Sequence, residues 1–175
     1  MKHTVSGLDK NYVYKWVDSP IGRLRLVGSD DGLAAVMWET QIPDRLPLTA
    51  ISEAADHPVL VETARQLEEY FAGTRKVFTV KLDFAGTDFQ RKVWHALLTI
   101  PFGETRSYGQ IAKQIGQPNA VRAVGAANGQ NPIPIIAPCH RVIGSTGKLT
   151  GFGGGLPVKA HLLSLEGAQT AAMAI

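Results

Sequence analysis

The chain has 175 residues, of which 45% are hydrophobic and 19% are charged, and its formal net charge is +3. These values predict a globular protein with one domain, or two small lobes that share a core. No run of about 18 apolar residues is present and the N-terminus lacks a signal-peptide pattern, so we expect a cytoplasmic protein with no membrane partner. One cysteine excludes an internal disulfide and a multi-thiolate zinc site, and the five histidines show no paired helical spacing. We therefore expect no metal.

The charge is unevenly distributed along the chain. Residues 1–85 hold 10 Lys/Arg and 12 Asp/Glu, whereas residues 86–150 hold 7 basic and 2 acidic side chains, a balance of +5. Scattered charge usually marks only a solvated surface. A basic block of this size beside a possible helix-turn-helix nevertheless indicates a polyanion as partner, bound in a salt-sensitive way.

Residues 1–85 predict a small α+β domain. Strands are expected where apolar residues alternate between turn sequences, at 12–17, 23–28 and 33–39. A polar connection follows at 40–55. A helix is expected to begin near Asp56, with Pro58 in its first turn, and a further strand is expected at 77–84. Because these residues show no catalytic constellation, we assign this domain a structural role.

Residues 86–175 predict a second, mostly helical domain. The run Thr87-Asp88-Phe89-Gln90 has the pattern of a capping box and begins a helix that ends at Pro101. A second helix at 107–115, a turn at Gly116 and a third helix from about residue 118 to 128 have the spacing of a helix-turn-helix.

The third of these helices has an unusual composition. Alanine and glycine fill most of its positions, and Arg122 is its only charge. A helix that reads base edges in the major groove normally offers several Arg, Asn or Gln side chains. A slim helix with one long cation fits the minor groove better and predicts sequence-independent binding. Taken alone, Arg122 is more typical of an ordinary helix surface than of a DNA contact.

The only cysteine, Cys139, lies in an apolar segment at 131–144. Prolines at 132, 134 and 138 fix φ and disfavour a helix, so we expect a rigid, buried arm that presents one thiol. A lone cysteine is usually an inert core residue. Here His140 and Arg141 follow it directly, and lowering the thiol pKa by about two, or about 2.7 kcal/mol, would make it mostly thiolate. A positioned histidine–carboxylate pair could supply that change.

The run Pro138-Cys139-His140-Arg141-Val142, inside a segment that starts Asn131-Pro132-Ile133-Pro134, resembles an established active-site signature. It is similar to that of the O6-alkylguanine-DNA alkyltransferases, the bacterial methylated-DNA–protein-cysteine methyltransferases. The resemblance extends over residues 86 to 167 and, more loosely, over the N-terminal part. It implies an α+β fold, with a small N-terminal lobe on a ribonuclease H-like sheet and a mostly helical C-terminal lobe with a helix-turn-helix.

The resemblance also implies a function in DNA repair. A member of this family transfers the alkyl group of O6-alkylguanine in duplex DNA to its own cysteine, once and irreversibly, and O4-alkylthymine is a further candidate substrate. The protein itself is the acceptor, so no cofactor is implied. The implied partner is duplex DNA bound in the minor groove by a monomer that associates with the nucleoid.

The resemblance implies a catalytic role for several side chains of this chain. Cys139 is the nucleophile, His140 draws the thiol proton through a water molecule, and Glu166 orients the imidazole. Asn131 holds the helix-turn-helix to the arm. Tyr108 pushes the 3′ phosphate, lies against the flipped base and donates a proton or hydrogen bond to the leaving purine. Without the resemblance, Glu166 would be taken for a helix-surface residue and His140 for an interior histidine.

Other positions are implied to bind DNA or the base. Arg122 occupies the gap left by the flipped nucleotide, and Ala123 and Ala127 lie on the same DNA-binding helix. The carbonyls of Cys139 and Val142 accept from the exocyclic amine of guanine, and the position of Gly153 donates toward O6, here from the backbone alone. The chain departs from the family pattern at His161 and Leu165.

Two other classes of function are compatible with parts of the sequence. A cysteine hydrolase also needs Cys and His, but adjacent Cys139 and His140 are not a protease signature, and such an enzyme would turn over repeatedly. A helix-turn-helix DNA-binding regulator would not need Cys139 at all. A non-catalytic lesion-binding relative lacks the cysteine, so its presence disfavours that class.

Overall fold

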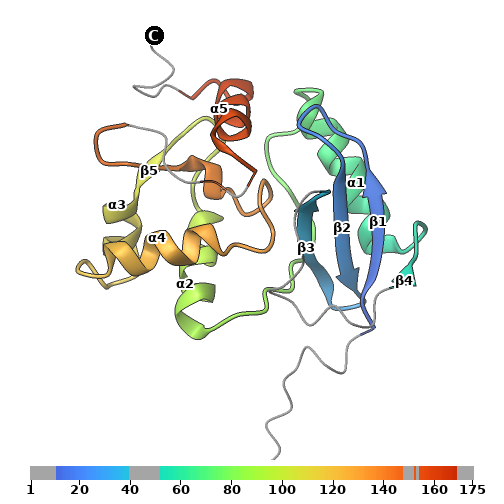
Figure 1. Cartoon of the computed structure of the whole chain (residues 1–175), viewed down its shortest axis with the longest axis horizontal. Helices are drawn as coiled ribbons and strands as arrows, with labels where there is room; N and C mark the ends of the chain where they lie inside the picture. The colour runs from blue at the N-terminus through green and yellow to red at the C-terminus, as the bar shows by residue number, and fades with distance from the viewer. Residues whose placement is uncertain (1–10, 40–51, 148–151, 153, 169–175) are drawn as a thin grey trace, which may run out of the picture. The chain divides into compact units, whose positions relative to one another are not determined.

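The computed structural model defines residues 11–39, 52–147, 152 and 154–168 of the chain. The chain divides into two compact units, Met1–Ala85 and Gly86–Ile175 (Figure 1). Within the defined residues, no helix is both long and apolar enough to cross a lipid bilayer.

The first unit is built on a four-stranded sheet in the order β3-β2-β1-β4. The antiparallel strands β1 (Val13–Val17), β2 (Leu24–Ser29) and β3 (Gly32–Trp38) confirm the three predicted from alternation. β4 (Ser52–Glu53) pairs in parallel with β1, within a segment for which the sequence predicts only a connection. Two polar residues are too short a run to show any alternation, so this strand has no sequence signal.

Helix α1 (Pro58–Phe71) lies against one face of this sheet (Figure 1). It begins as predicted, with Pro58 in its first turn. His57 caps it, because its Nδ1 accepts from the Val59 N–H at 3.2 Å. Leu60 and Leu67 of α1 are buried, and so are the inward side chains of β2, which gives the unit its core.

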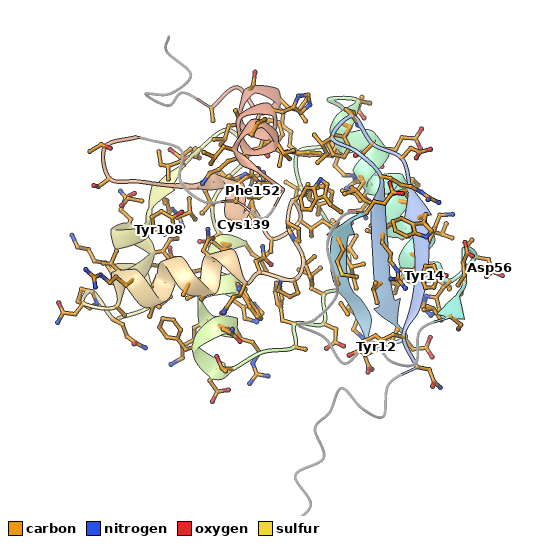
Figure 2. All side chains as sticks on the ribbon, viewed as in Figure 1. Tyr12, Tyr14, Asp56, Tyr108, Cys139 and Phe152 are labelled. Atoms are coloured by element: carbon orange, nitrogen blue, oxygen red, sulfur yellow. The ribbon has the colours of Figure 1, made fainter. Side chains whose placement is uncertain are left out.

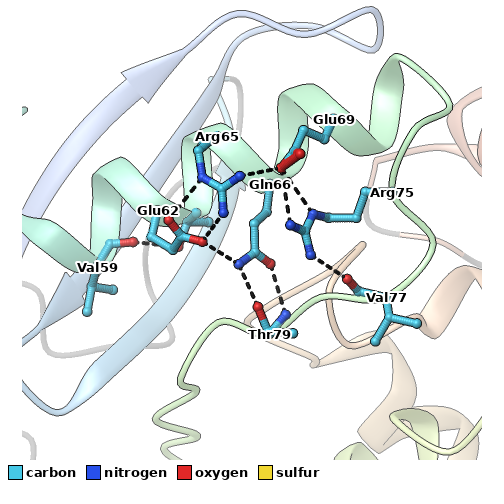
Figure 3. A network of polar contacts seen from close by, with 9 residues as sticks. Val59, Glu62, Arg65, Gln66, Glu69, Arg75, Val77 and Thr79 are labelled. Atoms are coloured by element: carbon cyan, nitrogen blue, oxygen red, sulfur yellow. Dashed lines mark hydrogen bonds and ion pairs between the residues drawn. The ribbon is translucent and has the colours of Figure 1, made fainter.

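Polar side chains of α1 hold the segment that follows it (Figure 3). Gln66 is buried, and its amide both accepts from the Thr79 N–H at 2.9 Å and donates to Thr79 Oγ1 at 2.8 Å. Arg75 donates to Glu69 and to the Val77 carbonyl. These bonds satisfy backbone groups that a strand would pair in a ladder.

The strand predicted at 77–84 is therefore wrong. In its place the chain makes one isolated bridge, between Leu82 and Leu33 of β3. Leu33 N donates to the Lys81 carbonyl and Asp83 N donates to the Leu33 carbonyl, both at 2.8 Å. The alternation that suggests a strand reflects an extended segment packed beside β3 rather than a full sheet strand.

The second unit begins with α2 (Asp88–Leu97), and its predicted capping box is confirmed. Thr87 Oγ1 accepts from the Gln90 N–H at 3.1 Å, and Gln90 Oε1 accepts from the Thr87 N–H at 2.9 Å. Gly86 precedes this cap, and a Cβ there would lie only 2.6 Å from the buried ring of Trp94. Glycine is therefore the one residue that lets the chain pass this ring.

The predicted helix-turn-helix consists of α3 (Tyr108–Gln114) and α4 (Val121–Gly129). Gly116, at φ +78°, makes the turn between them in a conformation that side chains disfavour. α4 begins about three residues later than predicted, and no side chain caps it. The indole N–H of buried Trp94 donates to the Ala127 carbonyl at 2.8 Å and so ties α4 to α2.

The rest of this unit surrounds the cysteine segment. β5 (Arg106–Ser107) and β6 (Val142–Ile143) form a short parallel pair. A single 3₁₀ turn at Cys139–Arg141 precedes β6, and α5 (Leu156–Leu165) follows it. The cysteine therefore lies between the end of α4 and the start of β6.

Candidate active site

The arm that carries Cys139 is held by the side chain of Asn131. Its Oδ1 accepts from the Ile133 N–H at 2.9 Å, and its Nδ2 donates to the Ala137 carbonyl at 2.8 Å. The same carbonyl accepts from the Cys139 N–H at 2.8 Å. The predicted buried arm is therefore found, and a turn at 134–136 folds it back on Asn131.

Cys139 is buried, with 5% of its surface exposed, in the second unit (Figure 2). Its carbonyl accepts from Asn128 Nδ2 of α4 at 3.4 Å. The resemblance assigns the link between the helix-turn-helix and the arm to Asn131, and the Asn131 N–H donates to the Asn128 carbonyl at 3.3 Å. The side-chain link, however, comes from Asn128, which sequence reasoning missed because a helical asparagine carries no distinctive signal.

His140 and Glu166 form a buried pair. His140 Nε2 lies 2.8 Å from Glu166 Oε2, at the C-terminal end of α5. Arg141 donates from Nε to Glu166 Oε1 at 2.8 Å and from Nη2 to Oε2 at 2.9 Å, and its Nη1 donates to the Ile100 carbonyl at 2.6 Å. The two residues after the cysteine therefore bind one carboxylate.

The charges of this pair fix the tautomer of the imidazole. Burial alone would raise the pKa of Glu166, but hydrogen bonds from His140 and Arg141 lower it to about 2. Burial lowers the pKa of His140, with Glu166 opposing, so the imidazole is neutral. An ionised carboxylate can only accept, so the His140 proton must reside on Nε2. Nδ1 is then left with a lone pair and, within the defined residues, has no hydrogen-bond partner.

The pKa of the Cys139 thiol differs from the value expected from the sequence. Burial raises the pKa of Cys139 to about 11, although a hydrogen bond from Asn131 and the charge of Lys159 both lower it. The expected shift toward thiolate is therefore wrong. The reason is that a neutral imidazole supplies no positive charge to offset the loss of solvent.

Lys159 of α5 is a site residue that sequence reasoning missed. It is fully buried and its Nζ donates to the Val142 carbonyl at 2.6 Å. Burial lowers its pKa to about 8, and the nearby Cys139 opposes that change. A usable signal was present, because a lysine three residues before Leu162 lies on the buried stripe of its helix.

The predicted DNA-binding residues lie on different faces of α4. Arg122 and Ala123 are exposed, whereas Ala127, predicted to contact DNA, is buried at 2% beside α2. Ala126 is exposed in its place. Tyr108, at the start of α3, is half-buried beside α4, since a Cβ at Gly125 would lie 3.8 Å from its ring (Figure 2).

Val142 and Gly153 are the two further positions that are predicted to contact the guanine base. The Val142 carbonyl lies next to the cysteine turn and accepts from Lys159 Nζ. Gly153 lies outside the described residues. Within those residues no group of three or more His, Cys, Asp or Glu side chains could hold a metal ion.

Comparison with known proteins covers both units. Residues 88–168 match the 6-O-methylguanine DNA methyltransferase, DNA binding domain, and residues 12–84 match the ribonuclease-like domain of the same family. The methylated-DNA–protein-cysteine methyltransferase of Mycobacterium tuberculosis is 55% identical in an alignment of 159 residues, and the match covers 87% of this chain and 91% of the relative. The chain belongs to the 6-O-methylguanine DNA methyltransferase family.

Further relatives and solved structures agree with this family. A methylated-DNA–protein-cysteine methyltransferase of Methanosarcina acetivorans is 51% identical over 159 residues, with 88% of this chain and 97% of the relative covered. The crystal structure of M. tuberculosis OGT in complex with DNA superposes with a TM-score of 0.81 at 53% identity, over 89% of this chain and 92% of that one. The predicted family, its methyltransferase class and the α+β fold class are thereby confirmed.

Proposed function

We propose that this chain transfers the alkyl group of O6-alkylguanine in duplex DNA to Cys139, once per molecule and irreversibly. The observation that carries the proposal is the single thiol beside a neutral His140 whose Nδ1 lone pair is free within the described residues and whose Nε2 is held by Glu166. The relatives are named for methyl transfer from DNA to a protein cysteine. O4-alkylthymine is a second candidate substrate.

The reaction requires a local base. With a pKa of about 11, ionising Cys139 at pH 7 without help would cost about 5 kcal/mol. His140 Nδ1 is that base. It takes the proton, directly or through a water molecule, as the sulfur attacks, so Cys139 need not ionise beforehand. Glu166 keeps the lone pair on Nδ1 and stabilises the imidazolium that forms.

The displacement is balanced without a cofactor. Sulfur forms a bond to the alkyl carbon, the carbon–O6 bond breaks, and its electron pair leaves with guanine. Guanine takes a proton, which Tyr108 donates or positions, so that the thiol proton in effect replaces the alkyl group. Water does not cleave the neutral carbon–sulfur bond of the thioether product at neutral pH, so each chain reacts once.

The base must leave the duplex to reach the thiol. We assign this step to residues 86–175, with α4 in the minor groove and exposed Arg122 in the space of the flipped nucleotide. Ala123 keeps the exposed face of α4 slim. The carbonyls of Cys139 and Val142 accept from the exocyclic amine, and the backbone of Gly153 donates toward O6. The bound species is a monomer, and residues 1–85 carry no chemistry.

Intact-mass spectrometry tests the reaction. The protein is incubated with a duplex that contains one O6-methylguanine, and we expect one methylene mass per chain, on the peptide with Cys139, and no further uptake with excess substrate. Cys139→Ser should abolish uptake but keep DNA binding. Repeated turnover, or uptake at another residue, would contradict the proposal. Unchanged cellular function of Cys139→Ser would favour a DNA-binding regulator instead.

A further inference from the structure

Ile135 has a backbone conformation that its side chain disfavours. Its φ is +76°, and it is the one non-glycine residue at positive φ within the described part of the chain. Every other position there with positive φ is a glycine, Gly116 in the helix-turn-helix among them. β-branched residues avoid this region more strongly than other side chains, because Cβ crowds the backbone. The chain thus accepts strain at Ile135 that it avoids elsewhere.

Burial explains how Ile135 stays in this conformation. Its side chain is fully buried, and so are Ile133 and Ala137 on either side of the turn. Relaxing φ to a negative value would turn the isoleucine side chain out of this apolar core. The side chain therefore acts as a lock, since a strained backbone conformation persists where the surrounding packing over-determines it.

The locked turn leads directly to the cysteine. Ala137 N donates to the Ile133 carbonyl at 2.9 Å, which closes the turn around Ile135. The Ala137 carbonyl then accepts from both Asn131 Nδ2 and the Cys139 N–H, each at 2.8 Å. The direction of that carbonyl depends on the backbone at Ile135, and the position of Cys139 depends on that carbonyl.

We infer that Ile135 is a positioning residue, whose buried side chain holds the arm in one strained conformation and thereby fixes the Cys139 thiol for alkyl transfer. The inference rests on the proposed function for its consequence in catalysis. Glycine at this position would remove the strain but also the lock. The arm would then sample several conformations, and fewer of them would place the sulfur in line with the alkyl carbon.

Two pairs of variants separate strain from side-chain volume. Ile135→Ala and Ile135→Gly both remove the buried side chain and differ mainly in the freedom of φ. At an ordinary position glycine is less stable than alanine, whereas at positive φ the order is reversed. We expect the Tm of I135G to exceed that of I135A by about 3 °C or more. The matched pair at buried Ile136, which has no positive φ, should show the ordinary order.

Positioning is read from exchange and from transfer. Both variants remove the lock, so in each the amides of Ala137 and Cys139 should exchange with solvent at least about tenfold faster than in the wild type, while the Val124 amide in α4 keeps its protection. The single-turnover rate of methyl transfer should fall by at least about tenfold in both relative to the wild type. The higher stability of I135G over I135A should thus restore neither protection nor rate, which a purely structural role would not produce.

Several results would overturn the inference. An I135G chain less stable than I135A would show that no strain is present, and exchange and transfer rates in I135G equal to those of the wild type would show that the side chain positions nothing. Ile135→Val, which keeps the β-branch, should stay within about threefold of the wild-type rate, and a loss as large as that of I135G would also overturn it. A wild-type chain that takes up no methyl group would contradict the proposed function, and the exchange comparison would still decide the inference.

Discussion

Replacing Glu166 with glutamine should prevent proton transfer from Cys139 to His140 and should destabilise the second unit. The variant keeps the shape of the side chain but removes the only anion that Arg141 and His140 bind among the described residues. The pKa of Glu166 in the folded chain is about 2, against an ordinary value of 4.5, and this difference corresponds to about 3 kcal/mol of stability at neutral pH. Leaving Arg141 buried without its partner gives a similar estimate of about 3 to 5 kcal/mol.

The effect on transfer follows from the imidazole tautomer. The glutamine amide has a donor as well as an acceptor, and its acceptor has to serve either Arg141 or His140. If it serves Arg141, His140 Nε2 faces an N–H and becomes an acceptor, so the proton moves to Nδ1 and the base is lost. We expect single-turnover methyl transfer to fall by about 10² to 10⁴.

The pH dependence distinguishes this carboxylate from others. A lowered pKa adds stability that is fully present above pH 4.5 and disappears as the pH falls toward about 2. Urea unfolding of the wild type should therefore lose stability across this range, and E166Q should lose less. Glu62 on α1 is the matched control, because Arg65 and Gln66 lower its pKa to about 2 as well, yet its side chain is only partly buried. Glu62→Gln should leave the rate unchanged. An E166Q chain with wild-type stability and a wild-type transfer rate would refute the role of Glu166 in holding His140 as the base.

Two further variants test the DNA face and the buried lysine. Arg122→Ala should slow repair of duplex DNA by more than it slows reaction with a free alkylated base, measured by single-turnover kinetics with both substrates, and equal losses would count against a role in base flipping. Lys159→Met should raise the pKa of Cys139 further, because it removes the buried cation beside the thiol, and should slow transfer by about tenfold. The pH profile of Cys139 alkylation by iodoacetamide measures this change, and an unchanged profile would contradict it.

The elements that repeat a pattern could be predicted from the sequence. The first three strands show alternation, and the box at Thr87 and Gln90 specifies the start of α2 by hydrogen bonds between neighbours in the chain. The prediction of a strand at 77–84 was wrong because Gln66 binds Thr79, a contact between residues that no local pattern connects. Strand β4 was not predicted for the opposite reason, since two residues form no pattern at all.

The site was predictable in its residue types but not in its electrostatics. The sequence places His140 beside Cys139, and the resemblance adds Glu166, which the structure brings within 2.8 Å of the imidazole. Burial is a property of the folded unit, so the raised pKa of Cys139 and the neutral His140 could not be read from neighbours in sequence. The same holds for the strain at Ile135, which no proline rule predicts.

The raised pKa of Cys139 suits the proposed reaction, in which each chain reacts once. At pH 7 a thiol with a pKa of about 11 is ionised in about one chain in 10⁴, whereas at its ordinary value of 9.0 about one in 10² would be. Because the thiolate is the reactive form, burial lowers the loss of Cys139 to electrophiles in solution by about a hundredfold. His140 can still accept the proton when an alkylated base lies against the sulfur, since proton transfer and attack then occur together. The features that keep the free thiol unreactive are therefore compatible with a fast reaction on the proposed substrate.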